Sequence, residues 1–240
     1  MTGRRVRYAK MVPVSAAELF RIAPRYDTPS YLWPRPKYRG LLHAVGAFAV
    51  VPLGVLLVLD AAGAEARIAA AVYVVAQLVV FATSASYHRI AKSPTARRRM
   101  QLADHSMIYL LIAGTWVPIC VLVLPERTGN AFLVGVVAAA TLGIGLKSFG
   151  IDRFPRSANA VYGVMGGAGL LALPGIIAGI SPGAVALLAV GGAAYAVGAF
   201  VLLFKRPDPL PDIFGYHEIW HACTVAAAAC HFAMVWMVVS

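Results

Sequence analysis

One segment of the chain, residues 214–231, combines residue types that bind metals with an otherwise apolar composition. Its sequence is FGYHEIWHACTVAAAACH. Ionisable residues inside a membrane are costly and commonly mark a functional site, and the rest of this segment is apolar enough for a membrane helix. His217 and His221 are four residues apart. On a helix their Cβ atoms lie on one face, about 5–6 Å apart, which suits two ligands of one metal.

The segment allows two interpretations of such a site. Residues 217–221 spell H-E-x-x-H, the zinc-protease motif in which the glutamate is the general base. The longer metzincin motif needs a glycine three residues after the second histidine, where this chain has Thr224. His231 lies ten residues beyond His221, about 15 Å along a helix, so the two cannot share a metal. An intramembrane metalloprotease therefore takes its third ligand from elsewhere, for which His88 is available. The other interpretation is one metal site assembled from several helices.

The composition predicts a membrane protein with several spanning helices. Hydrophobic residues make up 60% of the 240 residues, charged residues make up 13%, and the mean hydropathy is +0.74. Soluble domains average about 45–50% apolar and about 25% charged residues. Seven apolar runs reach the roughly 20 residues that a helix needs to span a membrane, at 42–61, 68–89, 104–124, 130–149, 158–179, 183–204 and 217–239. Four glycines in the fifth run, Gly163, Gly166, Gly167 and Gly169, predict close helix packing there.

The basic residues predict the orientation and the domain organisation. Nine of the 21 lysines and arginines precede the first run, and ten more lie in loops on the same side of the membrane. Only Arg67 and Arg127 lie on the other side. Because basic loops stay in the cytoplasm, we expect an all-α polytopic fold of the cell membrane with a cytoplasmic N-terminus and an outside C-terminus. A basic cytoplasmic arm takes up 1–40, and a seven-helix transmembrane domain takes up 41–240. The net charge of +11 then reflects topology, so the expected partners are membrane lipids and not nucleic acid.

This topology brings polar residues from three runs to one membrane depth. The second run ends on the cytoplasmic side with Ser84 and His88, the third begins there with Asp104, and the seventh begins there with the His217–His221 pair. Three histidines with one open position for water are the ligand set of a catalytic zinc. We expect these histidines to bind Zn²⁺, Asp104 to act as general base or to orient the water, and Ser84 to support either.

Each of these residues also has an ordinary structural explanation. A single histidine or aspartate near a helix end often caps the helix or reaches the interface, and Asp104 near a helix N-terminus gains dipole stabilisation without a metal. For His231 we favour a helix–helix hydrogen bond over a proton relay. We expect His43 and His105 to be interfacial or packing residues. Glu218 points away from His217 on a helix, so it either neutralises the basic loop or orients a ligand.

The same residues carry a resemblance to a known family. The segments SASYHR, LADHSMIYLLIAGTWVPI and FGYHEIWHACTVAAAACH, with PRPKYRGLLH upstream, resemble bacterial hemolysin-III-like proteins of the progestin and adipoQ receptor (PAQR) family. The resemblance covers about residues 34–236. It implies seven transmembrane helices, an intracellular N-terminus and a zinc ion near the cytoplasmic face. The family's zinc-binding histidines correspond to His88, His217 and His221, and its serine and aspartate to Ser84 and Asp104.

The site and the resemblance together indicate a zinc-dependent hydrolase of lipid amide or ester bonds, or a protein that regulates membrane lipid homeostasis. The wider superfamily contains alkaline ceramidases, which points to the amide class. Two other functions stay open. One is a non-catalytic membrane receptor or homeostasis regulator with a structural zinc. The other is an ion or proton transporter that uses Asp104, Glu218 and His231.

Overall fold

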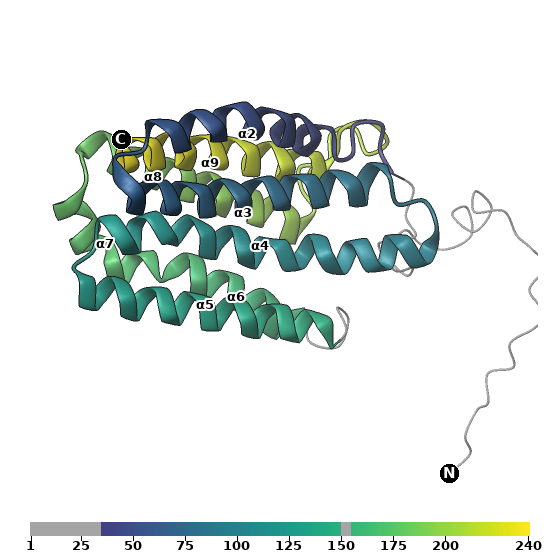
Figure 1. The fold of residues 1–240 in the computed structure, drawn as a ribbon. Helices are drawn as coiled ribbons and strands as arrows, with labels where there is room; N and C mark the ends of the chain where they lie inside the picture. Colours follow the sequence, from purple (N-terminus) through teal and green to yellow (C-terminus); the bar gives the residue numbers. More distant parts are fainter. Residues whose placement is uncertain (1–34, 150–154) are drawn as a thin grey trace, which may run out of the picture. The chain divides into compact units, whose positions relative to one another are not determined.

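The computed structural model describes residues 35–149 and 155–240, so most of the arm predicted at 1–40 lies outside the described residues. Arg35–Ser240 form one compact unit, in which the described helices pack side by side as a bundle (Figure 1). The helices are α2 (Leu41–Asp60), α3 (Gly63–Arg89), α4 (Pro94–Leu122), α5 (Glu126–Ser148), α6 (Pro155–Gly167), α7 (Gly169–Gly179), α8 (Pro182–Phe204) and α9 (Tyr216–Val239). The all-α class is confirmed.

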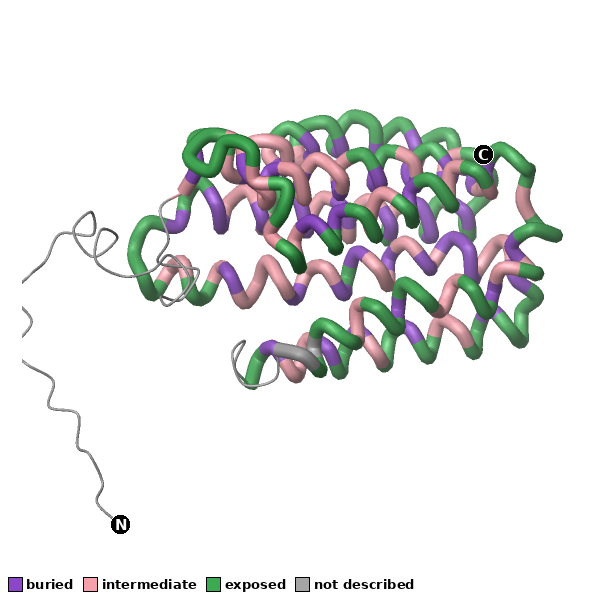
Figure 2. Tube along the Cα trace, turned by 180° about the vertical axis from the view of Figure 1, so that it is seen from behind, coloured by how far each residue is buried: buried purple, intermediate pink, exposed green. Residues whose placement is uncertain are grey.

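Seven stretches of the described residues are long and apolar enough to cross a membrane. α6 and α7 together supply one of them, over Asn159–Gly179. Apolar side chains on the outer faces stay exposed, as Phe48 (81%) and Leu171 (82%) show. Buried residues face neighbouring helices and exposed residues lie along the outside (Figure 2). A bundle with an apolar exterior belongs in lipid, and the seven predicted spans are confirmed.

The third span differs from its prediction at its start. α4 begins at Pro94, ten residues before the apolar run at 104. The Ser93 side chain accepts a hydrogen bond from the Ala96 amide (3.2 Å), and Pro94 occupies the first turn, a favourable combination for starting a helix. Asp104 therefore lies in the third turn of α4. Because the helix dipole acts only within the first turn, it does not explain why an aspartate is placed there.

The fifth span contains a break that separates two helices. α6 ends at Gly167, and α7 begins at Gly169. A Cβ atom added at Gly163, Gly166 or Gly167 would have no described neighbour within 4 Å. The expectation that these glycines serve close packing is wrong, because within the described chain their faces are open. Gly169 alone of the four lies against a side chain, the ring of Trp116, at 3.4 Å.

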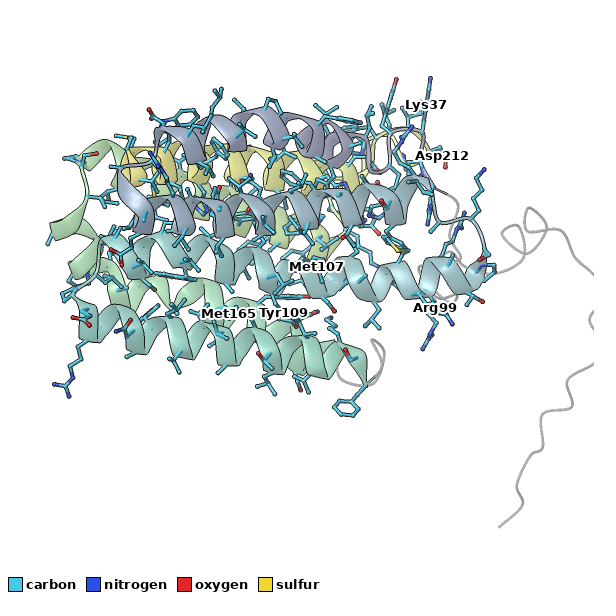
Figure 3. The ribbon with its side chains drawn as sticks, viewed as in Figure 1. Lys37, Arg99, Met107, Tyr109, Met165 and Asp212 are labelled. Atoms are coloured by element: carbon cyan, nitrogen blue, oxygen red, sulfur yellow. The ribbon has the colours of Figure 1, made fainter. Side chains whose placement is uncertain are left out.

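One end of the bundle is shaped by contacts between the segment before α2 and the loop before α9. The Lys37 amide donates to the Asp212 carbonyl (3.1 Å), and Lys37 and Asp212 lie together at that end in Figure 3. Gly40 precedes α2 with a φ of 76°, and a Cβ atom there would lie 2.6 Å from the Cβ of His88. Only glycine allows both this left-handed turn and this close approach. The start of α2 is thereby packed against the end of α3.

Candidate metal centre

Three histidines from two helices meet at this end of the bundle. His88 lies in the last turn of α3, and His217 and His221 lie in the first two turns of α9. One ring nitrogen of each lies within 4.8 Å of one ring nitrogen of both others. The ring centroid of His88 is 5.0 Å from those of His217 and His221, which are 4.7 Å apart. The structure thus brings the three predicted ligands together.

The surroundings of these rings fit a metal ion. Each ring has a buried nitrogen without a hydrogen-bond partner in the described part of the chain, namely Nε2 of His88, Nε2 of His217 and Nδ1 of His221. His88 and His221 are only 5% and 2% exposed. Buried nitrogens left without a partner are costly, and a metal ion would satisfy them. Neutral imidazoles suit zinc, and also copper, iron or nickel.

Ser84 and Asp104 form a polar pair next to this cluster. Ser84 lies one turn before His88 on α3 and is 2% exposed. Its hydroxyl interacts with the Asp104 carboxylate, which comes from α4. Because residues four apart on a helix share a face, the carboxylate lies about one turn from His88. Asp104 does not belong to the set of mutually close ligand atoms, which consists of the three histidines.

His43 is a fourth histidine of the site that the sequence did not single out. Its ring stacks on that of His221, with centroids 3.8 Å apart and planes 16° from parallel. Its Nε2 is hydrogen-bonded to Oγ1 of Thr224 (2.9 Å), whose hydroxyl also donates to the His221 carbonyl (2.8 Å). His43 packs as predicted, but it packs on a metal-ligand candidate. The feature of the sequence that could have identified His43 as a site residue is an ionisable side chain inside a membrane helix.

The Glu218 carboxylate makes contacts that stabilise the fold. Its side chain is 1% exposed, forms an ion pair with Nε of Arg39, and accepts a hydrogen bond from the Gly215 amide (2.8 Å). The second contact is one half of a capping box, in which the N3 carboxylate accepts from the N-cap amide at the start of α9. A carboxylate held by an arginine and a helix start is not free to act as the base of an H-E-x-x-H site. Glu218 thus neutralises a basic residue, but its partner is Arg39 of the arm before α2 and not the predicted basic loop.

Replacing Arg39 by methionine is expected to destabilise the fold by about 2–4 kcal/mol, because it leaves the buried Glu218 carboxylate without its cation. The thermal unfolding midpoint in detergent measures this effect. Lys92→Met, at an exposed position, is the matched control and should leave the midpoint unchanged. The double variant Arg39→Met/Glu218→Gln should recover part of the loss. Equal midpoints for Arg39→Met and Lys92→Met would contradict the assignment.

Arg35 holds the end of α3 that carries His88. One terminal nitrogen of its guanidinium donates to the carbonyls of His88 (2.8 Å) and Ala91 (2.9 Å). Burial, and after it the charge of Arg97, lowers the pKa of Arg35 from its ordinary value. This cation satisfies carbonyls that the end of a helix leaves unpaired. It thereby fixes the turn from which the His88 side chain projects.

The two other histidines lie outside the cluster. Nδ1 of His105 is hydrogen-bonded to the carbonyl of Gln101, one turn earlier on α4 (2.7 Å). Nε2 of His231 is hydrogen-bonded to the Leu188 carbonyl of α8 (3.3 Å). The predicted helix–helix hydrogen bond of His231 is confirmed. Both residues can therefore serve as controls for the three clustered histidines.

Comparison with known proteins agrees with this geometry. The family described as "Haemolysin-III related" matches residues 31–232. The chain belongs to this family. It is 30% identical over 198 residues to "Hemolysin-3 homolog" of Bacillus subtilis (strain 168), covering 81% of this chain and 90% of that protein. It is 31% identical over 198 residues to "Hemolysin-3" of Bacillus cereus, covering 81% and 87%.

Membership of the Haemolysin-III related family confirms the resemblance seen in the sequence. Together with the seven apolar helices it shows a multi-pass bacterial membrane protein. The region matched by the family includes all five predicted site residues. It also includes Arg39 and His43, which the structure adds to the surroundings of the cluster.

Proposed function

We propose that this protein is a zinc-dependent hydrolase of amide or ester bonds in membrane lipids, through which it adjusts the lipid composition of the membrane. One observation carries the proposal, namely three clustered imidazoles with unpartnered buried nitrogens beside the Ser84–Asp104 pair. Catalytic zinc sites have three protein ligands, whereas structural sites have four and are usually rich in cysteine. Among the described residues no cysteine or carboxylate joins the group of three histidines.

Each residue of the site has a defined task in this proposal. His88, His217 and His221 hold the ion through neutral ring nitrogens. A bound zinc polarises a carbonyl and makes water nucleophilic at neutral pH. A carboxylate oxygen of Asp104 accepts the proton of the attacking water and returns it to the departing amine or alkoxide, as the new C–O bond replaces the C–N or C–O bond of the lipid. Ser84 holds the carboxylate in place.

The proposal places this chemistry at the cytoplasmic leaflet. The clustered histidines lie in the last turn of α3 and the first two turns of α9. Lys37 and, at the basic start of α4, Arg99 lie at one end of the bundle (Figure 3), and the close approach of Gly40 to His88 places the end of α3 there as well. Basic residues favour the cytoplasmic side. The scissile bond of a lipid lies near the headgroup, so a site at the end of a membrane helix is at a suitable depth.

Elemental analysis of the purified protein, handled without chelators, tests the proposal together with an activity assay. We expect about one zinc per chain, and release of fatty acid from at least one member of a panel of lipid amides and esters in vesicles. Stoichiometric iron or manganese in place of zinc would correct the metal. Absence of any stoichiometric metal would overturn the proposal.

Replacing His43 by leucine is expected to weaken metal binding by about 10–100-fold, the range for residues that orient a metal ligand. The substitution removes the stacking contact with His221 and the hydrogen bond to Thr224. His43→Phe keeps an aromatic ring on His221 and should lose less affinity. Competition with a chromophoric chelator measures both. If His43→Leu binds as tightly as the wild-type protein, His43 does not position His221.

A structural metal in a non-catalytic regulator is the second candidate. The observation that favours it is the low exposure of His88 and His221, with His43 stacked against His221. This candidate predicts that metal removal lowers thermal stability, and that no lipid of the panel is hydrolysed by protein carrying stoichiometric zinc. The transporter alternative has no comparable support, because Asp104 interacts with Ser84 and His231 is hydrogen-bonded to the Leu188 carbonyl of α8.

A further inference from the structure

A groove runs along the bundle between α2, α3 and α9, which lie next to one another in Figure 1. Its volume is about 490 Å³, within the range of roughly 300–1,000 Å³ of small-molecule sites. Apart from Gln77 and Ser240, its lining is apolar. Small residues, among them Gly46, Ala49 and Ala229, leave the space that forms it. Ala49 and Ala229 are exposed, so in a membrane the groove faces hydrocarbon.

The groove continues the helix faces that carry the metal centre. On α3, Phe81 lines the groove one turn before Ser84, and Gln77 lines it one turn before Phe81. On α9, Val225 lines it one turn after His221. Residues three or four apart share a helix face. A ligand lying in the groove is therefore directed along these faces towards the histidines.

Two aromatic contacts separate the inner end of the groove from the cluster. Phe81 lines the groove, and its ring lies 5.1 Å from that of His43. His43 in turn stacks on His221 at 3.8 Å. A Cβ atom at Gly46 would lie 2.9 Å from the Phe81 ring, so glycine at this position lets Phe81 close the end of the groove. The groove thus ends next to the proposed reaction site.

The length of the groove suits an extended hydrocarbon chain. It follows α9 from Val225 to Ser240, about 22 Å at 1.5 Å per residue. One leaflet of the membrane core is about 15 Å thick. The groove is therefore long enough for the chain of one lipid.

Gln77 marks the groove as a ligand site. Its side chain is 2% exposed, and its Oε1 has no hydrogen-bond partner in the described part of the chain. Inside a membrane an amide oxygen without a partner is costly. A hydroxyl or amide N–H carried by a bound lipid would satisfy it. Pure packing between helices leaves no reason for a glutamine at this position.

We infer that this groove binds one hydrocarbon chain of the membrane lipid on which the metal centre acts, with the methyl end towards Trp236 and the reacting end towards Phe81. The link to catalysis rests on the proposed hydrolase function, whereas the binding of a chain does not.

Binding of a spin-labelled C18 fatty acid to the purified full chain in lipid nanodiscs tests this inference. We expect each chain to bind one fatty acid saturably, and the spin label of the bound fatty acid to be motionally restricted. Ala229→Trp and Ala49→Trp, which fill the groove from two different helices, should each weaken binding by about tenfold or more. Ala196→Trp, at an exposed position of α8 outside the groove, is the matched control and should bind as the wild-type protein does.

Three outcomes would overturn the inference. The first is wild-type binding by both groove variants, and the second is equal loss in Ala196→Trp. The third is a wild-type dimer that both groove variants convert to monomer, since a second copy would then occupy the groove. Failure of the hydrolase proposal can be distinguished from failure of this inference. The His217→Ala/His221→Ala protein should still bind one motionally restricted fatty acid, although it hydrolyses nothing.

Discussion

The double variant His217→Ala/His221→Ala is expected to lose its metal completely under conditions in which the wild-type protein retains it. Structural zinc sites with four ligands bind with about 10–16 kcal/mol, or about 2.5–4 kcal/mol per ligand, so removing two of three costs about 5–8 kcal/mol. Elemental analysis after gel filtration gives the metal content. The single variant His88→Ala should lower the content as well, because its ligand comes from a different helix, α3.

The matched controls for this experiment are His105→Ala and His231→Ala. Both remove a histidine from a membrane helix, but each of these rings is hydrogen-bonded to a backbone carbonyl away from the cluster. They should keep the full metal content. If the controls lose metal to the same extent as the double variant, the metal is not held by the three clustered histidines. The thermal unfolding midpoints of all variants separate loss of a ligand from loss of the fold.

Replacing Asp104 by asparagine is expected to reduce lipid hydrolysis by about 10²–10⁴-fold while leaving the metal content unchanged. Asparagine has nearly the same shape and keeps an oxygen that can interact with the Ser84 hydroxyl. It lacks the basicity needed to take a proton from water. The rate of fatty-acid release and the zinc content, measured on the same preparation, give both halves of the prediction.

Asp60→Asn is the control for the Asp104 experiment. Asp60 lies at the other end of α2 and accepts a hydrogen bond from Nε1 of Trp236 (2.7 Å), so its change should not affect turnover. Loss of metal in Asp104→Asn would make Asp104 a ligand, or a residue needed to build the site. Unchanged turnover with unchanged metal would remove Asp104 from the mechanism and leave the proton transfer to another group.

Much of the fold was predictable because its determinants are local in the sequence. Seven apolar runs define seven spans, since the thickness of the membrane sets the length of each helix. The four-residue spacings of His217 with His221, and of Ser84 with His88, define shared helix faces without any tertiary information. The alternation of loops across the membrane was enough to predict that these faces would meet at one end.

The start of α4 shows where hydropathy alone falls short. A helix continues as far as its backbone hydrogen bonds and caps allow, whether or not its residues are apolar. The cap at Ser93 and the proline at Pro94 extend α4 by ten residues beyond its apolar run. The local sequence contains these signals, but the membrane-span criterion ignores them. As a result, Asp104 lies in the third turn of α4 and not at the helix start that hydropathy predicted.

The composition of the site beyond its three ligands was decided by the tertiary structure. The sequence determined that His88, His217 and His221 could reach one membrane depth. Only packing decided that His43 of α2 stacks on His221, that Arg39 neutralises Glu218, and that a groove leads from these residues along α9. Spacing along one helix fixes which side chains share a face. Which faces of different helices touch depends on how the helices cross and on how closely a residue such as Gly40 lets them approach.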